Sequence, residues 1–277
     1  MSSRQPSTMG SSSVPPARAV GRLTALRKPA GGVRGIICGD IFRRIVSRTI
    51  AQQFGPEIEA ACAPFQYALS TRAGTECVAH ALQIITEFDE ETTIVSIDGI
   101  SAFDSISRNA MMEGLSRLPT ASSALPFIRA FYGHNSRFTW TDDNNLPHTI
   151  EQAEKGEQGD PLMPMLYALG QHQALTDFQN HVLPSEKIFA FLDDVYFTCK
   201  PERVRFLYDL LSASLWNHAR IRINLGKTRI WNRAGIPPIN CEDMTNGQGE
   251  NAWKGDPNLP TTQQGLKILG TPLGHID

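Results

Sequence analysis

The chain has 277 residues, of which 41% are hydrophobic and 19% charged, as in an ordinary folded protein. No apolar run approaches the roughly 20 residues that a membrane-spanning helix needs, so no membrane partner is expected. The five cysteines are odd in number and form no C-x-x-C pair. They argue against a disulfide framework and a zinc knuckle, and they predict a reduced, intracellular protein of the nucleus or cytoplasm.

The formal net charge of −2 is unevenly distributed. Residues 1–48 hold nine Lys and Arg against one Asp, a net charge of +8, so the rest of the chain carries −10. This asymmetry predicts a basic surface that meets phosphate, and a solvated basic tail is the alternative. Residues 1–30 are predicted to be a disordered, basic, Ser/Pro-rich tail. A mitochondrial transit peptide is a weakly supported alternative for its first 20 residues.

In chain order, apolar periodicity and capping residues predict a succession of helices and short strands. Helices are expected over residues 40–58, with Asp40 as N-cap, 75–88, 107–118, a long segment opened by Asp160-Pro161, and 203–219. Strands are expected over 92–97, 188–192, 195–199 and 264–270, with a further hairpin over 138–150. The order predicts an α+β fold in which a small antiparallel sheet packs on helices.

Asp193 and Asp194 lie between two apolar strands, where a two-residue turn is expected. Taken alone, this pair is more often turn chemistry than a metal site, because Asp is favoured in tight turns. Asp98 changes this interpretation, because it also ends an apolar strand. If that strand lies beside the hairpin, three carboxylates meet at one sheet edge. That arrangement suits two hard cations about 3.5–4 Å apart and in-line nucleotidyl transfer.

Five segments, in consistent order, resemble the palm motifs of reverse transcriptases. They are 96–106 (SIDGISAFDSI) for motif A, 156–164 (GEQGDPLMP) for B, 191–194 (FLDD) for C, 224–228 (NLGKT) for D and 266–270 (LKILG) for E. Upstream, the segments around Arg34 and Arg43-Arg44 resemble the basic motifs of the fingers. The resemblance covers about residues 31–274 and is to the reverse transcriptase domain of non-LTR retrotransposons, which are RNA-directed DNA polymerases.

This resemblance implies the fingers and palm of a right-hand polymerase. Residues 31–93 would be part of the fingers, and residues 94–277 the palm, with a fingers hairpin inserted at about 105–150. No thumb is expected after motif E. The implied cofactor is Mg²⁺, as two ions, with Mn²⁺ as the alternative. The implied partners are an RNA template, a DNA primer, dNTPs and further domains of a retroelement polyprotein.

The resemblance also implies roles for single residues. Metal binding and catalysis fall to Asp98, Asp193 and Asp194, with Lys227 as general acid or cation beside pyrophosphate; nucleotide binding falls to Arg34, Arg44, Phe103, Gln158 and Gly159; the primer grip falls to Leu269 and Gly270. Phe103 would be the steric gate against a 2′-hydroxyl, although a plain core role is the alternative. Arg43 competes with Arg44 for the triphosphate, and a solvated lysine is the alternative at Lys227.

Other functions remain open at this point. Gly35 replaces the family's usual proline, and Met163 stands where serine is common. Without a thumb, the chain could be an inactive or partner-dependent nucleic-acid-binding fragment. An RNA-directed RNA polymerase shares the palm chemistry, but Phe103 argues against it because such an enzyme must admit the 2′-hydroxyl. Leu192 also differs from the glycine common before the paired aspartates of that class.

Overall fold

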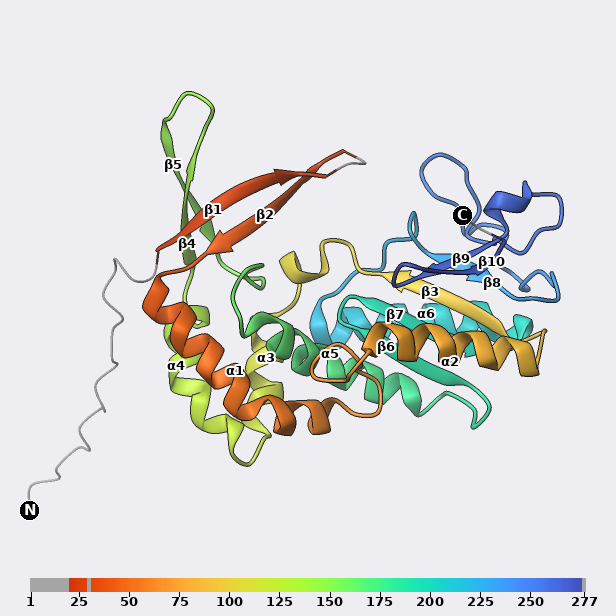
Figure 1. Cartoon of the computed structure of the whole chain (residues 1–277), viewed down its shortest axis with the longest axis horizontal. Coiled ribbons are helices and arrows are strands. Elements are labelled where there is room, and N and C mark those ends of the chain that lie inside the picture. Colours follow the sequence, from red (N-terminus) through yellow and green to blue (C-terminus); the bar gives the residue numbers. More distant parts are fainter. Residues whose placement is uncertain (1–19, 29–30, 276–277) are drawn as a thin grey trace, which may run out of the picture.

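The computed structural model describes residues 20–28 and 31–275 and has the expected α+β fold (Figure 1). Its main helices are α1 (Ile41–Cys62), α2 (Gly74–Phe88), α3 (Arg108–Ser116), α4 (Leu125–Tyr132), α5 (Met163–Gln179) and α6 (Val204–Ala219). Its strands are β1 (Val20–Arg27), β2 (Val33–Cys38), β3 (Thr93–Asp98), β4 (Ser136–Thr141), β5 (Pro147–Gln152), β6 (Lys187–Phe191), β7 (Asp194–Cys199), β8 (Arg229–Trp231), β9 (Gly265–Ile268) and β10 (Thr271–Gly274). Within the described ranges, no helix is both long and apolar enough to cross a membrane.

The central sheet has the strand order β6-β7-β3-β8, and all its neighbouring strands are antiparallel. Side chains alternate between its two faces, as the two-residue period of a strand requires. Val95 and Phe197 face the core formed with α5 and α6, whereas Ile94 and Tyr196 face α2 and the β9–β10 hairpin. The sheet is therefore covered on both faces, which explains why its strands are almost continuously apolar.

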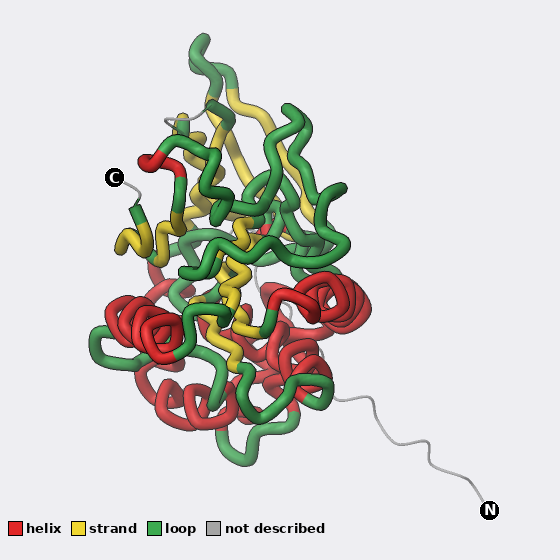
Figure 2. The backbone as a smooth tube through the Cα atoms, turned by 90° about the vertical axis from the view of Figure 1, so that its right-hand side faces the viewer, coloured by secondary structure: helices red, strands yellow, loops and turns green. Residues whose placement is uncertain are grey.

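A second sheet, the distal sheet, has the order β2-β1-β4-β5 and stands above α1 and α4 at the left of Figure 1. Figure 2, turned by 90°, shows the helices gathered in the lower half of the molecule, with the distal strands and long loops above them. The expected 138–150 hairpin is confirmed as β4–β5, and it joins this sheet.

Strand β1 corrects the predicted boundary of the N-terminal tail. The tail was expected to extend to residue 30, but Val20–Arg27 pairs with β2 on one side and, in parallel, with β4 on the other. A Cβ on Gly21 would lie 2.7 Å from Ile37 Cγ2, so glycine permits this close approach. The partner β4 is more than 100 residues away, so local composition could not reveal the pairing. The rest of the predicted tail, residues 1–19, lies outside the described residues.

The starts of α1 and α3 are as predicted, whereas the start of α5 differs from the prediction. The Asp40 carboxylate accepts from the Phe42 N–H at 2.9 Å and caps α1, while Ser107 caps α3. Asp160 was expected to cap the long helix, but α5 begins three residues later, at Met163. Asp160 still accepts from the Leu162 N–H at 2.9 Å, but its other oxygen is used by an ion pair with Arg43.

Candidate active site

The three predicted catalytic aspartates meet at one edge of the central sheet. Asp98 ends β3, and its register partner across the sheet is Asp194, the first residue of β7. Phe191 pairs with Asp194, so the turn consists of Leu192 and Asp193 rather than the expected Asp193 and Asp194. Leu192 has a left-handed φ of 56°, and such a residue needs support from its surroundings.

That support comes from Gln66, which is buried in the segment between α1 and α2. Its Oε1 accepts from the Leu192 N–H at 2.9 Å. The neighbouring Tyr67 N–H donates to the Ala190 carbonyl at 2.8 Å, so the segment lies along β6. The turn that carries Asp193 is therefore fixed by contacts from a distant part of the chain.

The electrostatics of this edge favour a bound cation. Burial is the largest cause that raises the pKa of Asp194 to about 6, and the negative charges of Asp193 and Asp98 add to it. Burial is also the largest cause that raises the pKa of Asp193, and Asp98 adds to it. Carboxylates withdrawn from water and crowded together are destabilised in their charged form, and a divalent cation reverses this effect. The donor set, all carboxylate oxygen, fits a hard ion such as Mg²⁺.

In this structure Asp98 is ion-paired with Lys227. The Lys227 Nζ donates to Asp98 Oδ2, and Asn224, which precedes Lys227 by three residues, donates its N–H to the Asp98 carbonyl at 2.8 Å. Among residues with described positions, no three His, Cys, Asp or Glu side chains are arranged to hold a metal ion. The predicted ligands thus share one edge, but they are not gathered into a ready-made coordination set.

Phe103 lies in the 3-10 turn that follows β3 and stacks on Tyr167 of α5, with ring centroids 4.6 Å apart. Tyr167 is fully buried, and within the described part of the chain its hydroxyl has no hydrogen-bond partner. Burial is the largest cause that raises the pKa of Tyr167, and the charges of Asp193, Asp98 and Asp194 add to it. Sequence analysis missed Tyr167, because it lies within an apolar helical stripe that predicts only a core position.

The basic residues of the fingers motifs take different places. Arg34 is exposed on β2, and its charge offsets part of the rise in the pKa of Asp193 that burial causes. Arg44 is exposed on α1, and its Nη1 lies 3.3 Å from Cys38 Sγ; its predicted role at the triphosphate stays a prediction. Arg43 is buried in ion pairs with Glu157 and Asp160, so it does not compete with Arg44 for a phosphate.

The predicted primer-grip residues share a cavity of about 530 Å³ with Asp98, Asp194 and Lys227. Leu269 and Gly270 both have positive φ and form the two-residue turn between β9 and β10. Glu250 and Lys254 also line this cavity, and the sequence did not predict their place there. Lys254 reaches it because its N–H donates to the Ile230 carbonyl at 2.7 Å, which lays residues 252–254 beside β8. This region is rich in Gly, Pro and Asn and has no periodicity that could predict the pairing.

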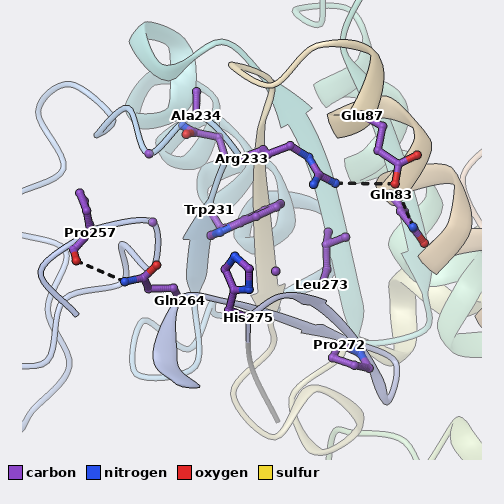
Figure 3. Close-up of a pocket in the computed structure, with 14 residues that line it drawn as sticks. Gln83, Glu87, Trp231, Arg233, Ala234, Pro257, Gln264, Pro272, Leu273 and His275 are labelled. Atoms are coloured by element: carbon purple, nitrogen blue, oxygen red, sulfur yellow. Dashed lines mark hydrogen bonds and ion pairs between the residues drawn. The ribbon is translucent and has the colours of Figure 1, made fainter. Parts of the chain in front are cut away.

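A second cavity, of about 480 Å³, lies among α2, β8 and β10 (Figure 3). Trp231 and Leu273 line it, and Arg233 reaches across to Glu87 at 3.7 Å. The three aspartates do not line this cavity. It is therefore distinct from the candidate active site.

Comparison with known proteins agrees with this geometry. The model of the family described as reverse transcriptase (RNA-dependent DNA polymerase) matches residues 26–273. The retrotransposable element SLACS 132 kDa protein of Trypanosoma brucei gambiense is 26% identical over 183 residues, which cover 66% of this chain and 15% of that protein. The chain thus corresponds to a small part of this relative's length.

Solved telomerase structures share the fold. Telomerase from Candida tropicalis, in complex with a TWJ fragment of telomeric RNA, superposes with a TM-score of 0.60 at 11% identity, over 78% of this chain and 41% of that one. The apo form gives 0.60 at 11% identity over 84% and 46%, and telomerase from Candida albicans gives 0.54 at 13% identity over 81% and 44%. Because the family match spans most of the chain, this protein belongs to the reverse transcriptase (RNA-dependent DNA polymerase) family.

Proposed function

We propose that this protein adds dNTPs to a DNA primer on an RNA template with two divalent cations, Mg²⁺ or alternatively Mn²⁺. The observation that carries the proposal is the convergence of Asp98, Asp193 and Asp194 at one edge of the central sheet. The raised pKa values of Asp193 and Asp194 support it. Burial and neighbouring carboxylates destabilise the charged forms, and a bound cation would offset this effect.

Asp98, Asp193 and Asp194 would hold the two ions. When bound, the ions activate the primer 3′-hydroxyl and offset charge on the triphosphate and its leaving group. Lys227 is paired with Asp98 in this structure, so it lies beside the predicted ligands. Its ammonium would hold or protonate the departing pyrophosphate.

The other predicted residues would position the substrates. Arg34 and Arg44 would bind triphosphate oxygens, because guanidinium pairs well with phosphate. Phe103 would lie under the sugar and exclude a 2′-hydroxyl. Its close stacking on Tyr167 supports this role, because a gate must resist displacement. Gln158 and Gly159 would contact the incoming base pair.

The turn at Leu269 and Gly270 would support the primer end, since it lines the same cavity as Asp98 and Asp194. The similarity to a retrotransposable element protein supports the proposal that the chain works with further domains of a retroelement polyprotein. We also propose an intracellular location, in the nucleus or cytoplasm.

Primer extension on an RNA template tests the proposal. Wild type should incorporate dNTPs with Mg²⁺, Asp193→Asn should not, and Asp209→Asn should behave as wild type because Asp209 is an exposed residue of α6 paired with Arg205. Equal incorporation by wild type and Asp193→Asn would refute the assignment of the catalytic carboxylates. A wild type that prefers rNTPs would instead indicate an RNA-directed RNA polymerase, and an inactive wild type a partner-dependent fragment.

A further inference from the structure

A buried ionic cluster joins the start of α1 to the loop that precedes α5. Its members are almost inaccessible to solvent, each at most 8% exposed: Arg43, Arg108, Tyr132, Ser136, Glu157 and Asp160. Arg43 is at its centre, because one guanidinium nitrogen lies 2.8 Å from Glu157 Oε2 and another 2.8 Å from Asp160 Oδ2. The guanidinium also lies over the rings of Phe131 and Tyr132, at 4.5 and 5.2 Å.

The two carboxylates of this cluster have further partners from the fingers helices and the distal sheet. Tyr132, at the end of α4, donates to Asp160 Oδ2 at 2.9 Å. Ser136, at the start of β4, donates to Glu157 Oε1 at 2.7 Å and accepts from Arg108 Nη2 at 2.8 Å. Arg43 is thus ion-paired with both carboxylates, while the Arg108 guanidinium donates to Ser136 and to the carbonyls of Lys155 and His134. Buried charges are tolerated when they are paired or hydrogen-bonded in this way.

Two members of the cluster, Glu157 and Asp160, flank Gln158 and Gly159, which are predicted to bind the nucleotide. Glu157 and Asp160 are buried, whereas Gln158 and Gly159 between them are accessible to solvent. The loop backbone is also fixed, because the Ile37 N–H of β2 donates to the Gln158 carbonyl at 2.7 Å. The contacts of Glu157, Asp160 and the Gln158 carbonyl therefore fix the backbone of the loop and leave Gln158 and Gly159 accessible.

We propose that Arg43 is a positioning residue that sets the Gln158–Gly159 loop for the incoming nucleotide; this inference rests on the proposed function. Arginine suits the role because its planar guanidinium can pair with two carboxylates at once. A lysine at the same position keeps the charge but offers a single ammonium, so it cannot hold Glu157 and Asp160 in the same way. Arg43 does not line the cavity that holds Asp98 and Asp194, so it would act through the loop.

Steady-state primer extension with Arg43→Lys tests the proposal. The KM for dNTP should rise about tenfold while kcat changes less than threefold, because nucleotide positioning is lost and the carboxylates at the sheet edge are untouched. Glu157→Gln and Asp160→Asn should change KM in the same direction. The matched control is Arg203→Lys, which weakens the ion pair of Arg203 with Glu186 (2.5 Å), outside the Arg43 cluster and the cavity that holds Asp98 and Asp194. Its KM should equal that of wild type.

A KM within twofold of wild type in folded Arg43→Lys would overturn the inference. A fall in kcat at constant KM would also do so, because it would mean a lower folded fraction. Wild type and Asp193→Asn are assayed in parallel, so an inactive wild type would count against the proposed function itself.

Hydrogen exchange provides a measurement that needs no activity. In wild type, the amides of Ile37 and Leu162 should exchange slowly, because they donate to Gln158 and Asp160. In Arg43→Lys both should exchange at least tenfold faster, while the Ala190 amide in the central sheet stays unchanged. Unchanged exchange at Ile37 and Leu162 would refute the positioning role.

Discussion

Burial and two neighbouring carboxylates raise the pKa of Asp194 to about 6, well above its ordinary value near 3.9. Between these two values the folded protein binds a proton that the unfolded chain does not. The contribution of Asp194 to stability therefore falls as the pH rises from about 4 to about 6, and the penalty is fully present at pH 7. A site prepared for cations is thus a source of instability without them.

Asp194→Asn should therefore stabilise the metal-free protein at pH 7. Because the carboxylate is partly exposed, solvent screening reduces the expected gain in the free energy of unfolding to about 1 kcal/mol. Urea unfolding in EDTA at pH 4.5 and pH 7 measures this, and the gain should be smaller at the lower pH. Asp209→Asn is the control. A variant that is less stable than wild type at pH 7 would contradict the electrostatic account.

At Phe103 the expected effect is on the choice of sugar. Phe103→Ala should raise the efficiency of rNTP use relative to dNTP use. Tyr167→Leu should act in the same direction but more weakly, because it removes the ring on which Phe103 stacks at 4.6 Å. Tyr167→Phe keeps that ring and should keep the ratio. The ratio of kcat/KM for the two nucleotides is the measurement, and no change in Phe103→Ala would remove its role as a gate.

At the scale of elements, prediction from sequence worked where the signal is local. The helices α1, α2, α3 and α6 and the strands β3, β6, β7 and β9 were predicted because periodicity and caps lie within each segment. Strands β1, β2, β8 and β10 and helix α4 were missed. The pairing of β1 with β4 and of β8 with β3 joins distant segments, and three-residue β8 is too short to show alternation.

The same limit applies to the candidate site. Strand ends placed Asp98, Asp193 and Asp194 correctly at one edge, because an acidic residue after an apolar strand is a local signal. The ion pair of Asp98 with Lys227 spans 129 residues, and Arg43 is buried by contacts with α4 and with the loop before α5, so neither could be predicted. The sequence could not distinguish Arg43 from Arg44, because burial is a tertiary property.

The loop between the distal sheet and α5 depends on glycine at residue 159. Gly159 has a φ of +115°, and an added Cβ would lie 2.3 Å from the Ile37 carbonyl oxygen. Gly159→Ala should therefore displace the loop from β2, lower the free energy of unfolding by roughly 1–3 kcal/mol and raise the KM for dNTP. Gly247→Ala is the matched control, because no atom lies within 4 Å of its added Cβ. Equal stability and KM in both variants would refute the close contact.

At the scale of the molecule, basic residues gather on two strands of the distal sheet. Arg22, Arg27, Lys28 and Arg34 are exposed on or beside β1 and β2 of the distal sheet. The chain after residue 48 carries a net charge of −10, so it offers little general attraction for a phosphate backbone. The distal sheet is therefore the expected source of the electrostatic part of binding to primer–template.

Removing charge from the distal sheet should weaken binding in a salt-dependent way. Arg22→Gln and Arg27→Gln should each lower the affinity for an RNA–DNA primer–template, and each should reduce the slope of log K against log salt by about one, because each lost phosphate contact releases fewer counterions. Fluorescence anisotropy between about 50 and 200 mM salt measures the slope. Lys187→Gln is the control, because Lys187 is exposed at the start of β6 in the central sheet. If Lys187→Gln changed the slope as much as the arginine variants, the attraction would come from the whole surface. The basic residues of β1 and β2 would then have no special part in binding.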